Sequence, residues 1–591
     1  MVDAPIGRAF PPVDVAPNVS THGSTIAAWG DGVIALDGDS GDLVRLDAAG
    51  EVSARLAIGD NASQLAVDRR NHRVYVADRA GDRVCIVEAD PADAAQLRSA
   101  GNLATRAEPY GVALTPDGKT LLVTTVADRS LSAFDLDAGT ERWSIDIGPE
   151  PRGVAVSFDG KKAIVTYLTT GAVAHVALGN EPRVSYTPIP TGGGVQLAGG
   201  FFYGGGRMGD AGAKPAHFAR AAFDAAYIGN GLAIVPHQSS SPGQDSMFED
   251  VRTYGGGDGP PIAYRVAMIA DGQGIAGTSK IALAELGAHQ PRAVAYDAAR
   301  DTVYIAGYGS DTISAIAYAS QNAVRGSRHW EVGEGCGPNG LDVRDNGDVV
   351  AFCSLSRRVV TVNAAGDVAK TEPIANSRLS ASARRGAELF RRGNSTVLSG
   401  DGTLACASCH PEGRTDGLSW RIEGHSLQTP LLAGRMTGTH PFKWDGKDPT
   451  LEDSLANTVL RLGGSGISAD QVADLEAFVT SLPAPRAPSV RDRKAVARGR
   501  RLFHDDAVGC ASCHQGDTLS DGKRYDLALD LDAVDTPSLI GLAHSAPYYH
   551  DGSAATLEAL LLENGSVHGM GNTSALSDGQ VSDLSAYLKT L

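Results

Sequence analysis

The sequence predicts a multi-domain protein in which an all-β seven-bladed propeller is followed by two tandem all-α domains. Two observations in the chain of 591 residues support this fold class: short strand signatures recur in the first part, and one helical pattern occurs twice in the second. Recurring strand units are typical of propellers, because each four-stranded blade buries its faces against its neighbours. We expect the propeller at 1–376 and the helical domains at 377–483 and 484–591.

The strand signature is a proline followed by a short apolar run. It occurs four times, with spacings of 42, 140 and 47 residues, at Pro109–Ala113, Pro151–Ala155, Pro291–Ala295 and Pro338–Asp342. A turn and a β-rich run follow each copy, which favours hairpins. Weaker copies near residues 31, 64 and 218 bring the number of blades to seven. Glycine-rich segments between residues 190 and 261 interrupt the rhythm, and they are either long loops on one face of the propeller or a disordered insertion.

This part resembles propellers of the Tyr-Val-Thr-Asn repeat type. The segments Val74–Asp78 and Val303–Ala306 carry the resemblance, which covers about residues 20 to 370. It implies the fold and no particular activity, since propellers host many unrelated functions.

The second part contains one helical pattern twice, at offsets of 104 to 113 residues. Each copy has an Arg-Gly-x-x-Leu-Phe segment, a Cys-Ala-Ser-Cys-His segment, a Thr-Pro loop and a closing helix. The first copy has these at Arg385–Phe390, Cys406–His410, Thr429–Pro430 and Ser468–Leu482, and the second at Arg498–Phe503, Cys510–His514, Thr536–Pro537 and Ser577–Leu591. The proline-rich stretch 483–488 is predicted to be a stiff linker between them.

Cys-x-x-Cys-His is the attachment sequence of c-type haem, because the two thiols add to the haem vinyl groups and the histidine becomes an axial iron ligand. A zinc site would need a second ligand pair at matching spacing, and neither copy contains one. We therefore expect two cytochrome c domains with two covalently attached haem c groups. Their binding residues are Cys406, Cys409 and His410 in the first copy and Cys510, Cys513 and His514 in the second.

The sixth coordination position of the first iron has several candidates. His425 follows His410 by fifteen residues, and His440 and Met436 lie further along. A vacant or water-bound position is the remaining alternative. This choice matters because the distal side of a haem decides between electron transfer and reaction with peroxide or oxygen.

The second iron has two candidates for its sixth ligand, His568 and Met570, in one glycine-rich segment before the last helix. A thioether ligand would raise the reduction potential relative to a second imidazole. His544 and His550 are also near in sequence, and we expect structural roles for both.

The tandem domains resemble the bacterial di-haem cytochrome c peroxidase family and its relative, the di-haem enzyme that matures methylamine dehydrogenase. The paired haem motifs, Phe442–Gly446 and Pro547–Gly552 carry this resemblance. It implies that Trp444 lies between the haems as an electron relay, where core packing is the alternative role. It also implies a calcium ion between the haem domains. The glutamate-methionine pair of those peroxidases is replaced here by Arg461–Gly466, which weighs against efficient peroxidase activity.

Composition excludes several classes of partner. Asp and Glu number 69 against 52 Lys and Arg, a formal charge of −17, so nucleic acid is not an expected partner. No run approaches the roughly 18 apolar residues of a membrane-spanning helix, so we expect no membrane span. The first residues lack the features of a signal peptide. Haem c chemistry nevertheless predicts a periplasmic or otherwise exported protein from which a signal has been removed.

Three cysteines lie outside the haem motifs. Cys85 is predicted to be a buried strand residue. Cys336 and Cys353 flank one predicted hairpin, and in an oxidising compartment they either form a disulfide or remain free thiols.

The favoured function is a di-haem, peroxidase-like oxidoreductase. One haem would exchange electrons with a redox protein, the other would react with peroxide or oxidise a small-molecule substrate, and Trp444 and His425 would be the catalytic side chains. The propeller would supply a docking or substrate surface. Two alternatives stay open: a pure electron-transfer protein whose propeller recruits a redox partner, and a propeller-borne catalytic site that feeds electrons to the haems.

Overall fold

The structure of the chain is a computed structural model. It describes residues 18–90, 92–93, 95–189, 217–229, 232–242, 261–270, 277–282, 287–319, 323–527, 530–564 and 570–591. These form two compact units. The first holds described residues up to 189 and those at 219–239 and 263–378, and the second holds those from 379 onward with the short stretches 217–218, 240–242 and 261–262. None of the described helices is long and apolar enough to cross a membrane.

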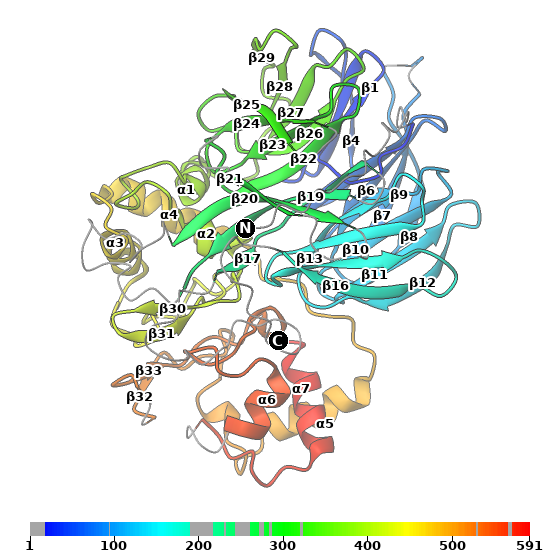
Figure 1. The fold of residues 1–591 in the computed structure, drawn as a ribbon. Coiled ribbons are helices and arrows are strands. Elements are labelled where there is room, and N and C mark those ends of the chain that lie inside the picture. Colours follow the sequence, from blue (N-terminus) through cyan, green and yellow to red (C-terminus); the bar gives the residue numbers. More distant parts are fainter. Residues whose placement is uncertain are drawn as a thin grey trace, which may run out of the picture. The chain divides into compact units, whose positions relative to one another are not determined.

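The first unit contains seven antiparallel sheets, so the predicted seven-bladed propeller is confirmed (Figure 1). Six sheets have four strands in chain order, and the fifth sheet along the chain has five strands. The first three sheets are formed by β1 (Ile26–Trp29), β2 (Gly32–Asp37), β3 (Asp42–Leu46), β4 (Val52–Ala57), β5 (Ala62–Asp68), β6 (Arg73–Asp78), β7 (Arg83–Glu88), β8 (Arg98–Ala104), β9 (Pro109–Leu114), β10 (Thr120–Thr125), β11 (Ser130–Asp135) and β12 (Thr140–Asp146).

The remaining four sheets are formed by β13 (Pro151–Val156), β14 (Lys162–Tyr167), β15 (Ala172–Ala177), β16 (Arg183–Pro188), β17 (Phe218–Arg220), β18 (Ala226–Gly229), β19 (Leu232–Ser240), β20 (Ile262–Ala270), β21 (Gly277–Ala282), β22 (Pro291–Asp297), β23 (Thr302–Gly307), β24 (Thr312–Ala319), β25 (Ala323–Glu331), β26 (Pro338–Val343), β27 (Val349–Cys353), β28 (Arg358–Val362) and β29 (Val368–Lys370).

Each proline signature begins the first strand of a sheet, at β9, β13, β22 and β26. Proline is tolerated there because the first residue of a strand need not donate to the ladder. The weaker copies near residues 31, 64 and 218 fall in the other three sheets. Most of the predicted glycine-rich loops between residues 190 and 261 lie outside the described residues.

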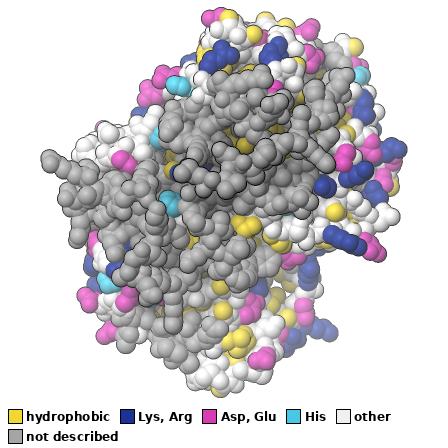
Figure 2. Space-filling view, in the orientation of Figure 1, with side chains coloured by type: hydrophobic (Ala, Val, Ile, Leu, Met, Phe, Trp, Pro, Cys, Tyr) yellow, Lys and Arg dark blue, Asp and Glu magenta, His cyan; other side chains and the backbone are white. Residues whose placement is uncertain are grey.

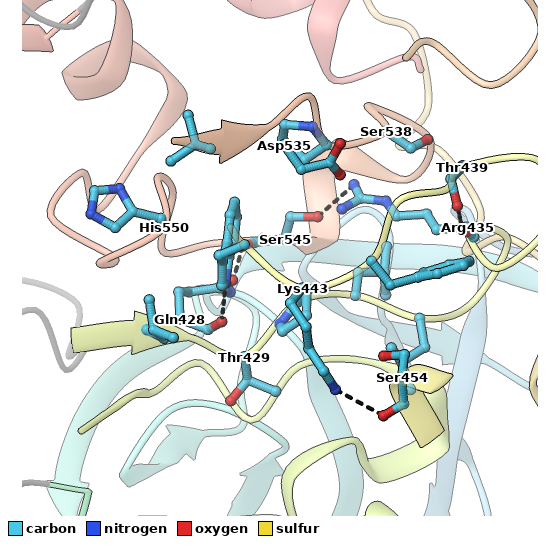
Figure 3. Close-up of a pocket in the computed structure, with 18 of the residues that line it drawn as sticks. Gln428, Thr429, Arg435, Thr439, Lys443, Ser454, Asp535, Ser538, Ser545 and His550 are labelled. Atoms are coloured by element: carbon cyan, nitrogen blue, oxygen red, sulfur yellow. Dashed lines mark hydrogen bonds between the residues drawn. The ribbon is translucent and has the colours of Figure 1, made fainter. Parts of the chain in front are cut away.

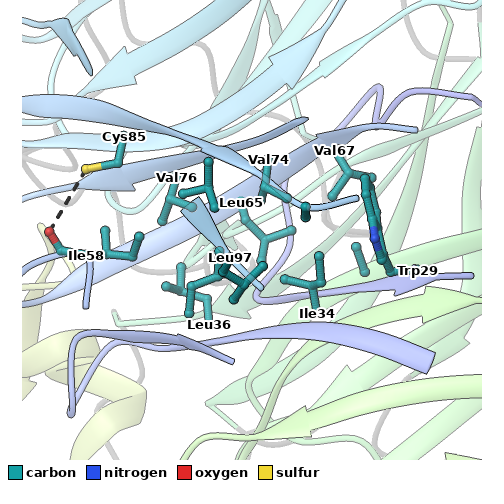
Figure 4. Packing of buried hydrophobic residues seen from close by; sticks show 14 of the residues in the cluster. Trp29, Ile34, Leu36, Ile58, Leu65, Val67, Val74, Val76, Cys85 and Leu97 are labelled. Carbon is teal, nitrogen blue, oxygen red and sulfur yellow. Dashed lines mark hydrogen bonds between the residues drawn. The ribbon is translucent and has the colours of Figure 1, made fainter. Parts of the chain in front are cut away.

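The core of the propeller lies between adjacent sheets. Figure 4 shows the cluster between the first two sheets, where side chains of β1 and β2 pack against those of β5, β6 and β7. Cys85 on β7 belongs to this cluster and is 7% exposed, so its prediction as a buried strand residue is confirmed. Other members are Trp29, Ile34, Leu36, Leu65, Val67, Val74 and Val76.

The ring is closed where the first and last sheets meet. The Ser24 hydroxyl donates to the Leu341 carbonyl at 3.0 Å and accepts from the Leu341 N–H at 3.1 Å. The Ala28 N–H donates to the Asp342 carboxylate at 2.8 Å. Apolar side chains of the two sheets, among them Ile26 and Val33 of the first and Val350 and Phe352 of the last, pack against each other, so closure buries both facing surfaces.

The segment 18–24 adds contacts along the inner strands of several sheets. The Ser20 carbonyl accepts from Leu114 of β9 at 2.9 Å, and the Thr21 carbonyl accepts from Val156 of β13 at 2.7 Å. A Cβ at Gly23 would lie 2.8 Å from a carbonyl oxygen of β9, so only glycine fits there. Because inner strands line a propeller's axis, this segment occupies axial space that the sequence did not reveal.

A disulfide joins Cys336, just before β26, to Cys353 at the end of β27. Both residues are buried, at 2% and 1% exposure, and they pack in the apolar cluster between the last two sheets. The sequence left open whether these cysteines form a disulfide or remain free thiols, and in the structure they form the disulfide.

Side chains of opposite charge alternate on the visible surface. In Figure 2, lysine and arginine side chains lie among aspartate and glutamate side chains on the coloured part of the face shown. Such mixing limits any extended field of one sign on that part of the surface.

The second unit is helical, as predicted, and it also contains two short hairpins that the prediction of all-α domains did not include. Serine or threonine caps begin the helices, for example Ser468, whose hydroxyl accepts from the Gln471 N–H. The elements are α1 (Ala381–Arg391), α2 (Cys406–Cys409), η2 (Pro411–Gly413), β30 (Ser419–Ile422), β31 (His425–Gln428), α3 (Leu451–Arg461), α4 (Ala469–Ser481), α5 (Arg493–Phe503), η3 (Cys510–Ser512), β32 (Arg524–Tyr525), β33 (Val534–Asp535), η4 (Leu542–His544), α6 (Leu557–Ala559), η5 (Leu560–Asn564) and α7 (Asp578–Leu588).

The duplicated Arg-Gly pair marks a close helix crossing. Gly386 of α1 lies against the backbone of α4, where a Cβ would be 1.9 Å from the Asp474 carbonyl oxygen. Arg385 forms two hydrogen bonds of 2.7 Å with the Asp474 carboxylate. Glycine lets the helices approach, and the bidentate ion pair fixes their rotation.

The second copy repeats this crossing between α5 and α7. A Cβ at Gly499 would lie 1.9 Å from the Asp583 carbonyl oxygen. Arg498 forms two hydrogen bonds of 2.6 Å with the Asp583 carboxylate. The sequence repeat is therefore a structural repeat.

Replacing Gly499 by alanine is expected to lower the free energy of unfolding of the second unit by about 1–3 kcal/mol, because α5 and α7 must separate. Urea denaturation followed by circular dichroism measures this change. Gly579→Ala is the matched control, since nothing lies within 4 Å of a Cβ at Gly579. Equal losses in both variants would contradict the crossing as the cause.

Replacing both Cys336 and Cys353 by alanine is expected to lower the free energy of unfolding of the propeller by about 3 kcal/mol, because the bond closes a loop with a sequence separation of 17. Thermal unfolding with and without reductant measures this. The reductant should destabilise the natural chain and leave the double variant unchanged. A variant as stable as the oxidised natural chain would show that the bond contributes nothing.

Candidate functional site: a cavity joining the two Cys-x-x-Cys-His motifs

One cavity of about 660 Å³ reaches both motifs of the second unit. Its lining is mostly apolar, with contributions from the clusters around Phe390 and Phe503. Five of the predicted haem-binding residues line it: Cys406, Cys409, His410, Cys510 and His514. The sixth, Cys513, is half-buried and follows η3 directly. The structure thus brings together two motifs that are 104 residues apart in the sequence.

Burial keeps both motif histidines neutral. It lowers the pKa of His410 to about 4, and the positive charges of Lys443 and Arg461 lower it further while backbone groups oppose them. The pKa of His514 is also lowered, chiefly by burial. His514 Nδ1 lies 3.1 Å from the Leu519 carbonyl oxygen, which leaves Nε2 as the nitrogen with a free lone pair. A neutral imidazole held in this way is the form that binds iron.

The motif thiols do not have the character of a redox dithiol. Burial raises the pKa of Cys406 and of Cys510 to about 11, and it raises the pKa of Cys409 well above the ordinary value. Reactive dithiols need a lowered thiol pKa. Nor do the described residues contain a cluster of three or more His, Cys, Asp or Glu that could hold a metal ion. These observations weigh against the zinc and dithiol alternatives.

Trp444 lies in the cavity wall and contacts both copies. Its indole N–H donates to the Gln428 carbonyl of the first copy at 2.7 Å. Its own carbonyl accepts from the Asp535 N–H of the second copy at 2.8 Å. The side chain is half-buried and lines the cavity, so it lies beside the space that joins the two motifs.

Of the three candidate sixth ligands in the first copy, Met436 lines the cavity, whereas His425 and His440 do not. His425 does not line the cavity, and its Nδ1 lies 3.4 Å from the Asp530 carboxylate. His440 is exposed, whereas Met436 lines the cavity and packs against the apolar cluster around Phe390. No sequence signal separated these three residues, because their burial depends on contacts made across the fold.

In the second copy, Met570 lines the cavity and packs against the cluster around Phe503. His568 lies outside the described residues. His544 is held by Arg414 at 2.9 Å and by the Arg486 carbonyl at 2.8 Å, which is a structural arrangement as expected.

His550 was also expected to be structural. Its Nε2 lies 2.6 Å from the Asp530 carboxylate, and the residue lines the cavity.

Three cations in the cavity wall were not identified from the sequence: Arg435, Lys443 and Arg461 (Figure 3 labels the first two). Arg435 is 8% exposed and donates to the Ile540 carbonyl at 2.6 Å and to the Ser545 hydroxyl at 2.8 Å. Its pKa is lowered to about 9 by burial. Among the described residues, no carboxylate offsets this lowering. One signal was available for Lys443, because it is one of the three positions at which the segments 441–446 and 547–552 differ.

Arg461 is a second cation that forms no ion pair within 4 Å among the described residues, although Glu423, Asp448 and Asp445 partly offset the lowering of its pKa. Its buried Nε has no hydrogen-bond partner in the described part of the chain, and burial lowers its pKa. Buried cations without anions are costly. A largely apolar group that carries carboxylates, such as haem with its two propionates, matches the apolar lining and these cations together. The residues present therefore fit haem.

Comparison with known proteins agrees with this cavity. Residues 496–591 match the cytochrome c family. The chain is similar to hydrazine synthase subunit gamma of Kuenenia stuttgartiensis, with 27% identity over 279 residues, covering 34% of this chain and 78% of that protein. It is also similar to the methylamine utilization protein MauG of Methylophilus methylotrophus, with 26% identity over 262 residues, covering 33% of this chain and 78% of that protein.

Among solved structures, Kuenenia stuttgartiensis hydrazine synthase overlaps with a TM-score of 0.39 and 14% identity, covering 60% of this chain and 96% of that chain. The sequence matches confirm the resemblance seen in the C-terminal motifs. The C-terminal part of the chain contains a cytochrome c domain, and it binds haem c covalently.

Asp535 provides a pH test of the cavity wall. Burial, with help from Asp521, raises its pKa from 3.8 to about 8. The folded protein therefore binds a proton that the unfolded chain releases, so the free energy of unfolding falls as pH rises from about 4 to 8 and levels off above. Asp535→Asn should reduce this fall in urea titrations of the holoprotein between pH 5 and 8. Asp532→Asn, at an exposed position, should not, and an unchanged slope in Asp535→Asn would contradict the assignment.

Proposed function

We propose that this chain is an exported di-haem c-type oxidoreductase in which one haem transfers electrons and the other reacts with a small oxygen-containing molecule or oxidises a substrate. The observation that carries the proposal is the shared cavity, which both Cys-x-x-Cys-His motifs line. When bound, a c-type haem supplies one-electron transfer and, where its iron has an open position, binding and reduction of such molecules. We further propose domain limits of 377–483 and 484–591.

The two copies offer different surroundings to their haems. Met570 lines the cavity in the second copy, where its thioether is available as a sixth ligand. In the first copy His425 is turned to Asp530, so we assign it no place as a ligand. Met436 of the first copy also lines the cavity, and we propose that it stays in the apolar cluster around Phe390. On this proposal the second haem is six-coordinate and transfers electrons, and the first has the open position.

Trp444 is proposed to connect the two haems. Its indole is anchored to the first copy and its backbone to the second, so the ring is held at the junction. A fixed aromatic ring between two redox groups shortens the distance that each electron must cross. The calcium ion implied by the resemblance remains a proposal.

The propeller is proposed to be a docking surface for a redox protein or a substrate. A catalytic site on its axis is less favoured, because the segment 18–24 contacts the inner strands there. The alternative of pure electron transfer differs in one observable, the absence of a high-spin iron.

The proposal is tested on the full-length holoprotein made in a host with a haem c assembly system. Intact mass should show two haems, and Cys406→Ala with Cys409→Ala should show one. Electron paramagnetic resonance of the ferric protein should show one high-spin and one low-spin signal. The high-spin signal should disappear with one equivalent of hydrogen peroxide. Two low-spin signals that peroxide leaves unchanged would overturn the oxidoreductase in favour of electron transfer.

A further inference from the structure

Lys443 stands out from its counterpart in the second copy. The segments 441–446 and 547–552 have the same backbone form: each has an isolated bridge, Phe442 with Asp448 and Tyr548 with Ala554. Lys443 and Tyr549 occupy equivalent positions, with φ of 72° and 69°. A left-handed backbone is unusual for residues other than glycine, and such strain gathers at functional sites. The duplication therefore keeps a strained backbone while changing the side chain that it presents.

The Lys443 ammonium makes two hydrogen bonds and one longer ion pair. It donates to the Ser454 carbonyl at 3.0 Å and to the Thr458 hydroxyl, both on α3 (Figure 3 shows the first). The Asp448 carboxylate lies 3.7 Å away, which is an ion pair beyond hydrogen-bond length. An ammonium has three donors. Its third N–H thus has no acceptor within hydrogen-bond distance among the described residues, and the amine lines the cavity.

The amine and the first haem motif lie on different parts of the cavity wall. Both motif cysteines are on α2, whereas α3 holds the amine. The two are close enough that the charge of Lys443 lowers the pKa of His410.

The charged side chains that face Lys443 are Asp448 and Arg461, and the titratable thiol of Cys406 in the motif is also near. Burial and Arg461 lower its pKa to about 8, and Asp448 opposes them. At neutral pH the ammonium is therefore mostly charged.

We propose that Lys443 is the hydrogen-bond donor to a small anionic or oxygen-containing ligand at the open position of the first haem. Three features support this role: the strained backbone, the N–H whose nearest further acceptor is Asp448 at 3.7 Å, and the nearby motif. Arg461 is itself the last residue of α3, its Nε has no hydrogen-bond partner among the described residues, and it remains available for the haem carboxylates. This inference rests on the proposed open position of the first haem, and it names Lys443 as the side chain that recognises the ligand bound there.

Fluoride binding to the ferric holoprotein tests this role, because fluoride is a small anion that depends on hydrogen-bond donors beside the iron. Lys443→Met keeps the length of the side chain and removes the donor. Lys447→Met is the matched control, since Lys447 is on the same segment, is 64% exposed and is paired with Asp445. Haem content and thermal unfolding establish that each variant is folded. The fluoride Kd should rise about tenfold or more in Lys443→Met, the value of one charged hydrogen bond, and less than twofold in Lys447→Met.

The other outcomes overturn the inference in distinguishable ways. A fluoride Kd unchanged in Lys443→Met would mean that Lys443 serves another group, such as a haem carboxylate. A natural chain that is low-spin and becomes high-spin in Lys443→Met would make the amine itself the sixth ligand. If all variants are low-spin and bind no fluoride, the proposed open position fails and this role falls with it.

Discussion

The second unit depends on the close crossing of two helices in each copy. Gly386 and Gly499 allow helix backbones to touch, and an arginine-aspartate pair beside each glycine holds them there. Each crossing joins the first helix of a copy to its last helix. The chain between these two helices can therefore surround a large cavity while the ends of the copy stay fixed to each other. An empty cavity of this size would lower the stability of the fold, because its lining would lack packing contacts. A covalently held prosthetic group supplies those contacts.

The two copies have diverged inside a common frame. Their capping serines, crossing helices and strained turns correspond, whereas the side chains that face the cavity differ: Lys443 and Trp444 stand where Tyr549 and His550 stand in the second copy. Frame residues are constrained by backbone contact, so they stay alike. Residues toward the cavity are free to change, and this is how one duplicated module provides two chemical environments.

Local patterns in the sequence were sufficient for much of the fold. Proline signatures marked the inner strands, and two Cys-x-x-Cys-His pentapeptides marked the predicted haem sites, because both signals lie within a few residues. The axial course of 18–24, the burial of Arg435 and the turn of His425 toward Asp530 depend on partners more than 40 residues away. No pattern along the chain records such contacts. Cys336 and Cys353 are an intermediate case. The predicted hairpin placed the two cysteines near each other, but it did not distinguish a disulfide from free thiols.

Closure of the propeller has a kinetic consequence. The contacts that complete the ring join Ser24 to Leu341, which are 317 residues apart. They form only after all seven sheets have been made and, in an exported chain, delivered across the membrane. Until then the facing apolar surfaces of the first and last sheets stay exposed, and such long-range contacts form slowly. We expect this step to limit the rate of folding and to be the time at which the chain most needs protection from association.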